Sequence, residues 1–260
     1  MQADFFQKVL LIYGFNFFKY LFVAGGLFLF FNILFKKAFV KNKIQPNRSN
    51  KKSDFLREFY HSNSSIIISV LFTAPILLTP LSEYTNYSFS FTTLKNVSIW
   101  WSPVILILLF LIHDTYFYWT HWLIHKPKLF KHFHVVHHKS HNPTALSSFS
   151  FNYTEALCQM FFGVIILFLI PLNRSMVLLF GIVEISMNAY GHLGYEIAPL
   201  WFRRTFLFKM MVTSTHHNLH HSKTHYNFGL YFRFWDHLMK TEHPKYEEYY
   251  DEIQARRLAN

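Results

Sequence analysis

Five long apolar stretches limit the folds that this chain can adopt. They cover Val9–Phe35, Ser65–Leu81, Val97–Ile112, Ala156–Leu172 and Ser175–Tyr190. About 20 apolar residues cross the hydrocarbon of a bilayer, where only helices and closed barrels satisfy the backbone. Charged residues make up only 15% of the 260 residues, against about 25% in soluble domains. We therefore expect an all-α integral membrane bundle of four to five transmembrane helices, in a single domain 1–260.

The basic residues indicate an orientation for this bundle. Many of them lie in the loop 36–58 between the first two stretches, and such loops usually face the cytoplasm. Alternate crossings then put the N-terminus and residues 83–96 outside, and both histidine-rich segments in a cytoplasmic helical cap. The net charge of +11 comes largely from such loops, so we expect no nucleic-acid partner. The first stretch should be retained in the mature protein, because the N-terminus lacks the basic region and the small-residue cleavage site of a secretory signal.

Histidine is the anomaly of the composition, with 17 residues, most of them in two windows. HWLIH places His121 and His125 four residues apart, and the boxes HVVHH (134–138) and HNLHH (217–221) each place three rings on one helical face. A pH sensor or a basic membrane patch needs no such repeated box, whereas neutral imidazole is a common metal ligand. Eight or more imidazoles exceed the ligands of one ion, so the pattern predicts more than one metal ion.

The ligand type narrows the choice of metal. The chain has one cysteine, Cys158, which excludes a thiolate cluster. Catalytic zinc sites use three protein ligands and an open position, which would leave many of these histidines unexplained. Two redox-active iron ions fit the count better, and zinc could replace them in isolated protein.

The ordered boxes HWLIH, HVVHH and HNLHH resemble the sterol desaturase/fatty acid hydroxylase superfamily of integral membrane di-iron enzymes. DTYFYWTH, GHLGYE and HHNLHHSKTHYNFGLYFRFWDHLMKT follow in family order, over roughly residues 98–245. The resemblance implies a catalytic region 97–245, after N-terminal helices and a basic loop (1–96) and before a polar tail (246–260). It implies nine metal ligands, namely His121, His125, His134, His137, His138, His192, His217, His220 and His221. Five histidines remain open between ligand and other roles: His113, His132, His141, His216 and His225.

Some positions depart from the family pattern. Trp122 stands where many relatives have Arg, Asn152 replaces a His, and Lys240 takes the place of a late Gly. None of these changes removes a ligand of the boxes. Because of these differences, the substrate of any one relative cannot be assumed for this chain.

Four polar side chains are candidates to orient the ligand rings. Asp114 lies on one helical stripe with Tyr118, His121 and His125, although it could equally cap a helix. Glu184 and Asn188 lead at four-residue spacing to His192, inside the last apolar stretch, where a carboxylate is costly. Asp236 in FWDH is the fourth.

The resemblance implies O2-dependent hydroxylation or desaturation of a sterol-like, fatty acyl or other long-chain lipid. Electrons would come from a separate donor, either cytochrome b5-like or ferredoxin-like, because the chain shows no dinucleotide fingerprint. Phe149, Phe151, Phe161 and Phe162 could line a lipid groove, or simply pack against lipid. The alternative is a non-enzymatic membrane metal-binding protein or transporter, but a transporter would hold its ligands near the bilayer midplane. Here we expect the ligands past the helix ends, on one side.

Overall fold

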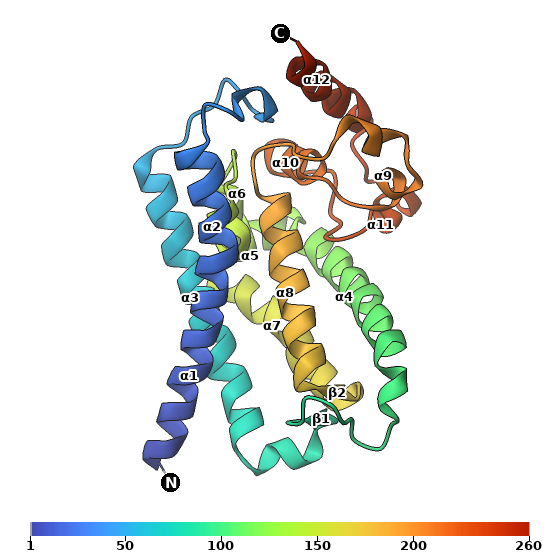
Figure 1. Ribbon diagram of the computed structural model, residues 1–260. Coiled ribbons are helices and arrows are strands. Elements are labelled where there is room, and N and C mark those ends of the chain that lie inside the picture. Colours follow the sequence, from blue (N-terminus) through green and yellow to red (C-terminus); the bar gives the residue numbers. More distant parts are fainter. Residues whose placement is uncertain (1, 260) are drawn as a thin grey trace.

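The computed structural model describes residues 2–259 and is built almost wholly of helices (Figure 1). Within these residues the only strands are β1 (Tyr87–Ser88) and β2 (Leu172–Asn173), which pair in parallel. The helices are α1 (Gln2–Tyr20), α2 (Gly26–Phe28), α3 (Lys52–Leu78), α4 (Ser102–Ile124), α5 (Pro127–Phe133), α6 (Val135–His138), α7 (Tyr153–Leu169), α8 (Arg174–Gly191), α9 (Phe206–Met210), α10 (Ser214–Lys223), α11 (Phe234–Leu238) and α12 (Tyr246–Leu258). The predicted all-α fold is confirmed.

Three helical segments are long and apolar enough to cross a membrane: Ala3–Leu34, Lys52–Leu78 and Ile99–Ile124. The first is continuous because π-helical turns at Leu21–Gly25 join α1 to α2, and further π-helical turns at Leu29–Leu34 extend α2. Large apolar side chains such as Phe18 and Phe22 are exposed on it, as expected where hydrocarbon replaces water. The predicted hairpin of the last two apolar stretches forms as α7 and α8, of 17 and 18 residues. A count of four to five spans stays a prediction.

The chain alternates between the two ends of the bundle, as the apolar stretches predicted. Figure 1 shows the N-terminus, β1 and β2 at one end, and the loop after α2 together with α6 and α10 at the other. Pairing of Tyr87 with Leu172 ties the loop after α3 to the turn between α7 and α8. Both histidine-rich segments therefore lie at the same end as the basic loop. That this end faces the cytoplasm stays a prediction.

Two predicted boundaries are wrong. The basic loop is shorter than 36–58, because α3 begins at Lys52 and Asp54 accepts a hydrogen bond from the Lys51 backbone (2.9 Å) at its first turn. The third apolar helix does not end at Ile112: α4 continues to Ile124, since no proline or glycine lies between Pro103 in its first turn and Pro127. His121 thus lies on the membrane helix rather than past its end.

Packing near the histidine end fixes the segment after α6. The Tyr20 hydroxyl and the Ser62 hydroxyl both donate to the Leu146 carbonyl, at 2.7 and 2.8 Å. Leu146 packs in one core cluster with Ala24 and Ala189, whose small side chains let helices approach closely. These contacts lock the connection between α6 and α7 against α1, α3 and α8.

Candidate metal centre

The structure brings all nine predicted ligands together, in two adjoining groups that could each hold a metal ion. Within each group the candidate ligand atoms lie within 4.8 Å of one another. The five-histidine group comprises His121, His125, His134, His138 and His220, and the four-histidine group comprises His137, His192, His217 and His221. Among residues 2–259, none of the five histidines left open joins either group.

Helix ends and short helices position these rings. α4 carries His121 and is followed by His125 at its C-cap, and His192 follows α8 in the same way. His134 separates α5 from α6, which carries the next two rings of its box. α10 carries the third box, and its N-cap is Thr213, whose hydroxyl accepts a hydrogen bond from the His216 backbone (3.2 Å). These helix ends gather at the end of the bundle opposite the N-terminus (Figure 1).

Pairs of Nε2 atoms face each other across both groups. The distance is 3.0 Å between His121 and His134, and 3.0 Å between His138 and His220. In the four-histidine group, the Nε2 of His192 lies 3.1 Å from that of His137 and 3.1 Å from that of His217. Two nitrogens that bind one ion at about 2.1 Å and at about a right angle lie about 3 Å apart. The spacing therefore suits coordination of a shared ion.

For His121, His137 and His192, the partners of the outer nitrogens indicate that the facing Nε2 carries no proton. A carbonyl only accepts, so Nδ1 donates from His121 to Phe228 (2.9 Å), from His192 to Asn188 (2.8 Å) and from His137 to Ser150 (3.4 Å). A neutral ring protonated on Nδ1 has a bare Nε2. The Nε2 atoms of His137 and His192 thus present two lone pairs to each other, which a cation between them would satisfy.

Burial keeps the rings in the neutral form that binds metal. Desolvation lowers the pKa of His192 to about 4. It also lowers the pKa of His125 to about 2, with a further contribution from the neighbouring His121. Burial holds the pKa of the remaining rings outside α4 well below the usual range: His134, His137, His138, His217, His220 and His221.

The prediction that Asp114 orients a ligand ring directly is wrong. Its carboxylate accepts hydrogen bonds from the backbone of Tyr231 (2.8 Å) and Phe232 (3.2 Å) instead, because this loop packs alongside α4. Asp236 likewise accepts from the backbone of Phe228 and Gly229, both at 2.9 Å. The two carboxylates therefore do not contact the ligand rings, but hold the loop that does.

The loop held by Asp114 and Asp236 is what reaches the rings. Its Phe228 carbonyl accepts from His121, and the Tyr226 carbonyl accepts from the Nδ1 of His220 at 2.7 Å. For Asn188, the backbone carbonyl rather than the side chain holds His192. Main-chain oxygens thus supply the partners that sequence patterns had assigned to side chains.

Glu155 is the carboxylate that the sequence analysis missed as an orienting group. Its Oε1 lies 2.6 Å from the Nδ1 of His134, and both side chains are almost completely buried. Glu155 is the last residue of FNYTE, and its spacing to His134 of 21 positions gives no helical periodicity. Only the packing of α7 against α5 brings the two together.

The histidines outside the two groups have other surroundings. The Nδ1 of His113 lies 2.8 Å from the Tyr231 hydroxyl. His216 is buried, with its Nε2 3.8 Å from Asp236. The side chains of His132, His141 and His225 are exposed.

Residues 106–241 match the sequence profile of the fatty acid hydroxylase family. The chain belongs to this family. It is 34% identical over 132 residues to cholesterol 25-hydroxylase of Rattus norvegicus, covering 50% of this chain and 44% of the relative. It is 26% identical over 185 residues to a delta(7)-sterol 5(6)-desaturase of Gibberella zeae (71% and 55%), and 30% over 161 residues to the C-4 methylsterol oxidase of Schizosaccharomyces pombe (58% and 50%).

The resemblance seen in the histidine boxes is thereby confirmed at the level of the family. The chain spans about half the length of the curated relatives it matches. No solved structure matches it. The matched region covers α4 to α11 and all nine predicted ligands, whereas α1 and α3 lie outside it.

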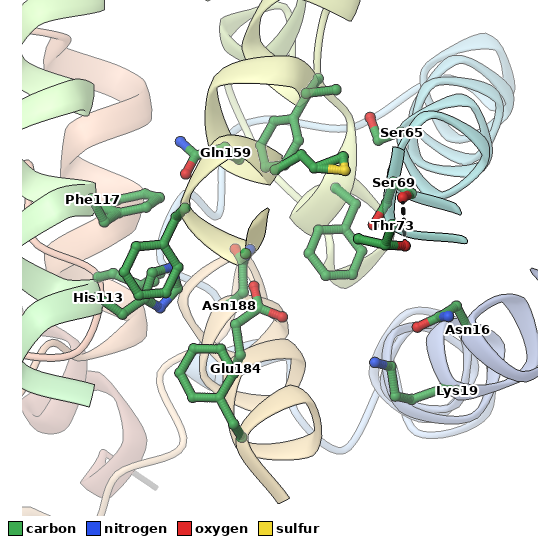
Figure 2. Close-up of a pocket in the computed structure, with 18 residues that line it drawn as sticks. Asn16, Lys19, Ser65, Ser69, Thr73, His113, Phe117, Gln159, Glu184 and Asn188 are labelled. Atoms are coloured by element: carbon green, nitrogen blue, oxygen red, sulfur yellow. Dashed lines mark hydrogen bonds between the residues drawn. The ribbon is translucent and has the colours of Figure 1, made fainter. Parts of the chain in front are cut away.

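A cavity of about 240 Å³ lies inside the bundle of this fatty acid hydroxylase family member, separated from the ligand histidines by aromatic side chains. Phe117 and Phe151 line it, and their ring centroids lie 4.9 Å from His121 and 5.3 Å from His137. Of the predicted apolar liners, Phe149 and Phe162 also face it, whereas Phe161 is exposed elsewhere. Figure 2 shows its walls, contributed by α1, α3, α4, α7 and α8.

Proposed function

We propose that this protein is a membrane oxidoreductase that hydroxylates or desaturates a lipid with O2, using two iron ions held by the nine histidines. The observation that carries the proposal is the set of facing Nε2 atoms about 3.0 Å apart in two buried groups. The five-histidine group offers more nitrogens than the four of a structural zinc site. Family membership and relatives that are named as sterol hydroxylases, desaturases and oxidases support lipid oxidation.

Iron bound in these groups would supply the redox chemistry that activates O2 toward an unactivated C–H bond. The protein's own contribution is geometry. The carbonyls of Phe228, Tyr226 and Asn188 fix the orientation of three ligand rings, and Glu155 stands behind a fourth. Such partners set the tautomer and basicity of metal-binding imidazoles. Deep burial of the rings keeps bulk water away from the reacting carbon.

The substrate would come from the bilayer and the electrons from a second protein. The cavity lies among the membrane helices, so a long-chain or sterol-like lipid can reach the histidines without leaving the membrane. Lys128, Lys131 and Lys139 are exposed beside the second box. We infer that a separate acidic donor, cytochrome b5-like or ferredoxin-like, docks at this end, and that this end is cytoplasmic with the N-terminus outside.

Metal content and turnover test the proposal together. Purified protein loaded anaerobically with Fe(II) should bind two irons, and should sustain O2 consumption beyond one equivalent per protein only when both a reductant and a lipid substrate are present. The His132→Ala variant, whose ring is exposed, serves as the control that keeps both properties. Stoichiometric zinc with no reductant-dependent turnover after iron loading would instead support a non-enzymatic metal protein.

Lipid analysis of a deletion strain identifies the reaction. The substrate should accumulate there, and the missing product should differ from it either by one added oxygen or by the loss of two hydrogens. The first result assigns a hydroxylase and the second a desaturase. An unchanged lipid profile would contradict both.

A further inference from the structure

Polar and charged side chains gather in the middle of the membrane bundle, in the wall of the cavity. Lys19 on α1 and Glu184 on α8 carry opposite charges there, accompanied by Asn16 and Asn188. An ionisable residue at this depth is costly, and such residues usually serve a function. Lys19 and Glu184 take no part in holding the metal ligands, so the proposed iron site does not account for them.

These two charges point into the cavity rather than pairing with each other. Figure 2 shows the Lys19 ammonium and the Glu184 carboxylate directed from α1 and α8 toward the open space between them. Within residues 2–259 no ion pair of 4.0 Å or less joins them. Lys19 reaches close to α8 because residue 181 is glycine: a Cβ there would lie 3.0 Å from its Nζ. The Asn16 amide donates to the Ile12 carbonyl (2.9 Å), which leaves its side-chain oxygen as an acceptor.

We infer that this cluster, the Lys19–Glu184 site, binds the hydroxyl group of a neutral lipid. The Lys19 ammonium can donate to the hydroxyl oxygen while Glu184 accepts its proton, so one group satisfies both charges. A free carboxylate could pair with Lys19 but would leave Glu184 facing a like charge, and an amine could pair with Glu184 but would leave Lys19 facing one, so neither satisfies both groups. A methyl ether lacks the proton that Glu184 needs, and a buried charge left without its partner is costly.

The position of the site sets which part of the lipid would react. This step rests on the proposed function, because it takes the histidines as the oxidising centre. Glu184 precedes His192 by eight positions along α8, which is roughly 12 Å at the rise of a helix. Phe117 and Phe151 line the cavity next to the ligand rings. The hydrocarbon would therefore extend from the bound hydroxyl to the metal ions, and oxidation would fall on a carbon remote from that hydroxyl.

The Lys19–Glu184 site is not a property of the matched family region alone. Residues 106–241 match the family profile, whereas Asn16 and Lys19 belong to α1. The N-terminal helix would thus give this chain its own choice of substrate.

Equilibrium binding tests the inference without turnover. The probes are cholesterol and hexadecanol, each beside its methyl ether and a carboxylate with the same hydrocarbon skeleton, bound to the full chain in nanodiscs under anaerobic conditions. Hydrogen bonds to charged groups correspond to a preference of about tenfold or more for the alcohol of at least one skeleton. Lys19→Met and Glu184→Gln should each reduce that preference to within about twofold, with metal content unchanged.

Two controls separate this site from a structural charge pair. Lys8→Met removes an exposed lysine of the same helix, which pairs only with Asp4, and should keep the full preference. The double variant of Lys19 and Glu184 restores neutrality, so a purely structural pair would bind like wild type, whereas a hydroxyl site would stay unselective. If the variants of Lys19 and Glu184 cannot be purified, the affinities of the wild-type protein for alcohol and methyl ether still test whether it selects a hydroxyl group.

Wild type that binds ether as tightly as alcohol in both skeletons overturns the inference. So does a preference that survives in both single variants. Selective alcohol binding by a protein that shows no iron-dependent turnover would leave the hydroxyl site standing and refute the proposed function instead.

Discussion

Replacing Glu155 by Gln should weaken the binding of one metal ion and leave the binding of the other unchanged. Glu155 Oε1 lies 2.6 Å from the Nδ1 of His134, and each side chain is at most 2% exposed. In such a dry setting the carboxylate favours the Nδ1–H tautomer and raises the basicity of the facing Nε2. Gln keeps the shape of the side chain but removes its charge. His134 belongs to the five-histidine group only, so the effect should be confined to that ion.

The expected size follows from the loss of one orienting partner. Removing such a partner lowers metal affinity by about 10- to 100-fold, or about 1.4–2.7 kcal/mol. Anaerobic competition for Fe(II) against a chelator of graded strength, followed by elemental analysis, should show one site titrating early and the other at wild-type affinity. Iron-57 Mössbauer spectra would show which of two environments is lost.

Glu58→Gln is the matched control for this experiment. Glu58 is also a buried carboxylate, but it accepts a hydrogen bond from Thr144 (2.6 Å) and belongs to neither histidine group. Its variant should keep both irons at wild-type affinity. If Glu155→Gln binds both ions with wild-type affinity, or binds both more weakly to the same extent, then Glu155 does not support one ion alone.

Three further outcomes follow from the same geometry. His192→Ala should lower bound iron from about two ions toward one, because it removes the ring of the four-histidine group whose Nε2 faces those of His137 and His217. His132→Ala should keep two ions, and equal iron in both variants would contradict the grouping. Gly229→Ala should lower the melting temperature by several degrees and loosen the ion of the five-histidine group, since the added Cβ would clash with the Phe232 carbonyl in the loop whose Phe228 and Tyr226 carbonyls hold His121 and His220. Gly163→Ala, where nothing lies within 4 Å, should be neutral or stabilising. Metal-free protein should lose stability as the pH falls from about 6.5 to about 4, because burial lowers the pKa of His192 to about 4 and the unfolded chain therefore binds the proton first. The contribution is roughly 3 kcal/mol for this ring, and a melting temperature that does not change with pH across this range would refute it.

The sequence was sufficient for the bundle and for the choice of candidate ligands. Apolar length and basic loops gave the order of crossings, because a bilayer leaves the backbone few alternatives. Local spacing also placed His121 and His125 on one face of α4. The spacing of residues along the chain does not predict contacts between segments that are distant in the sequence. Glu155 and the Phe228 carbonyl reach ligand rings from α7 and from a C-terminal loop, and no periodicity along the chain predicts either contact.

Asp114 shows why a helical stripe misleads inside a bundle. Its spacing to His121 would let its carboxylate follow the same face of α4, but two backbone N–H groups of the loop at Tyr231 compete for the same oxygen. Those donors would otherwise be buried without a partner, which costs about as much as a lost hydrogen bond. The Phe228 carbonyl of the same loop holds His121 instead. The identity of the orienting atom is thus decided by how the loop packs.

The spacing within the HxxHH box explains why each of the two histidine groups draws on both boxes. Its first and last histidines are four residues apart and lie almost above each other on a helix, whereas the fourth position points about 100° away from the last. HVVHH accordingly gives His134 and His138 to the five-histidine group and His137 to the other. HNLHH does the reverse, giving His217 and His221 to the four-histidine group and only His220 to the five. Each box therefore links both groups, and the two boxes together supply three nitrogens to each. His121 and His125 complete one group and His192 the other, so removing either box would take ligands from both ions at once, whereas removing HWLIH would affect one.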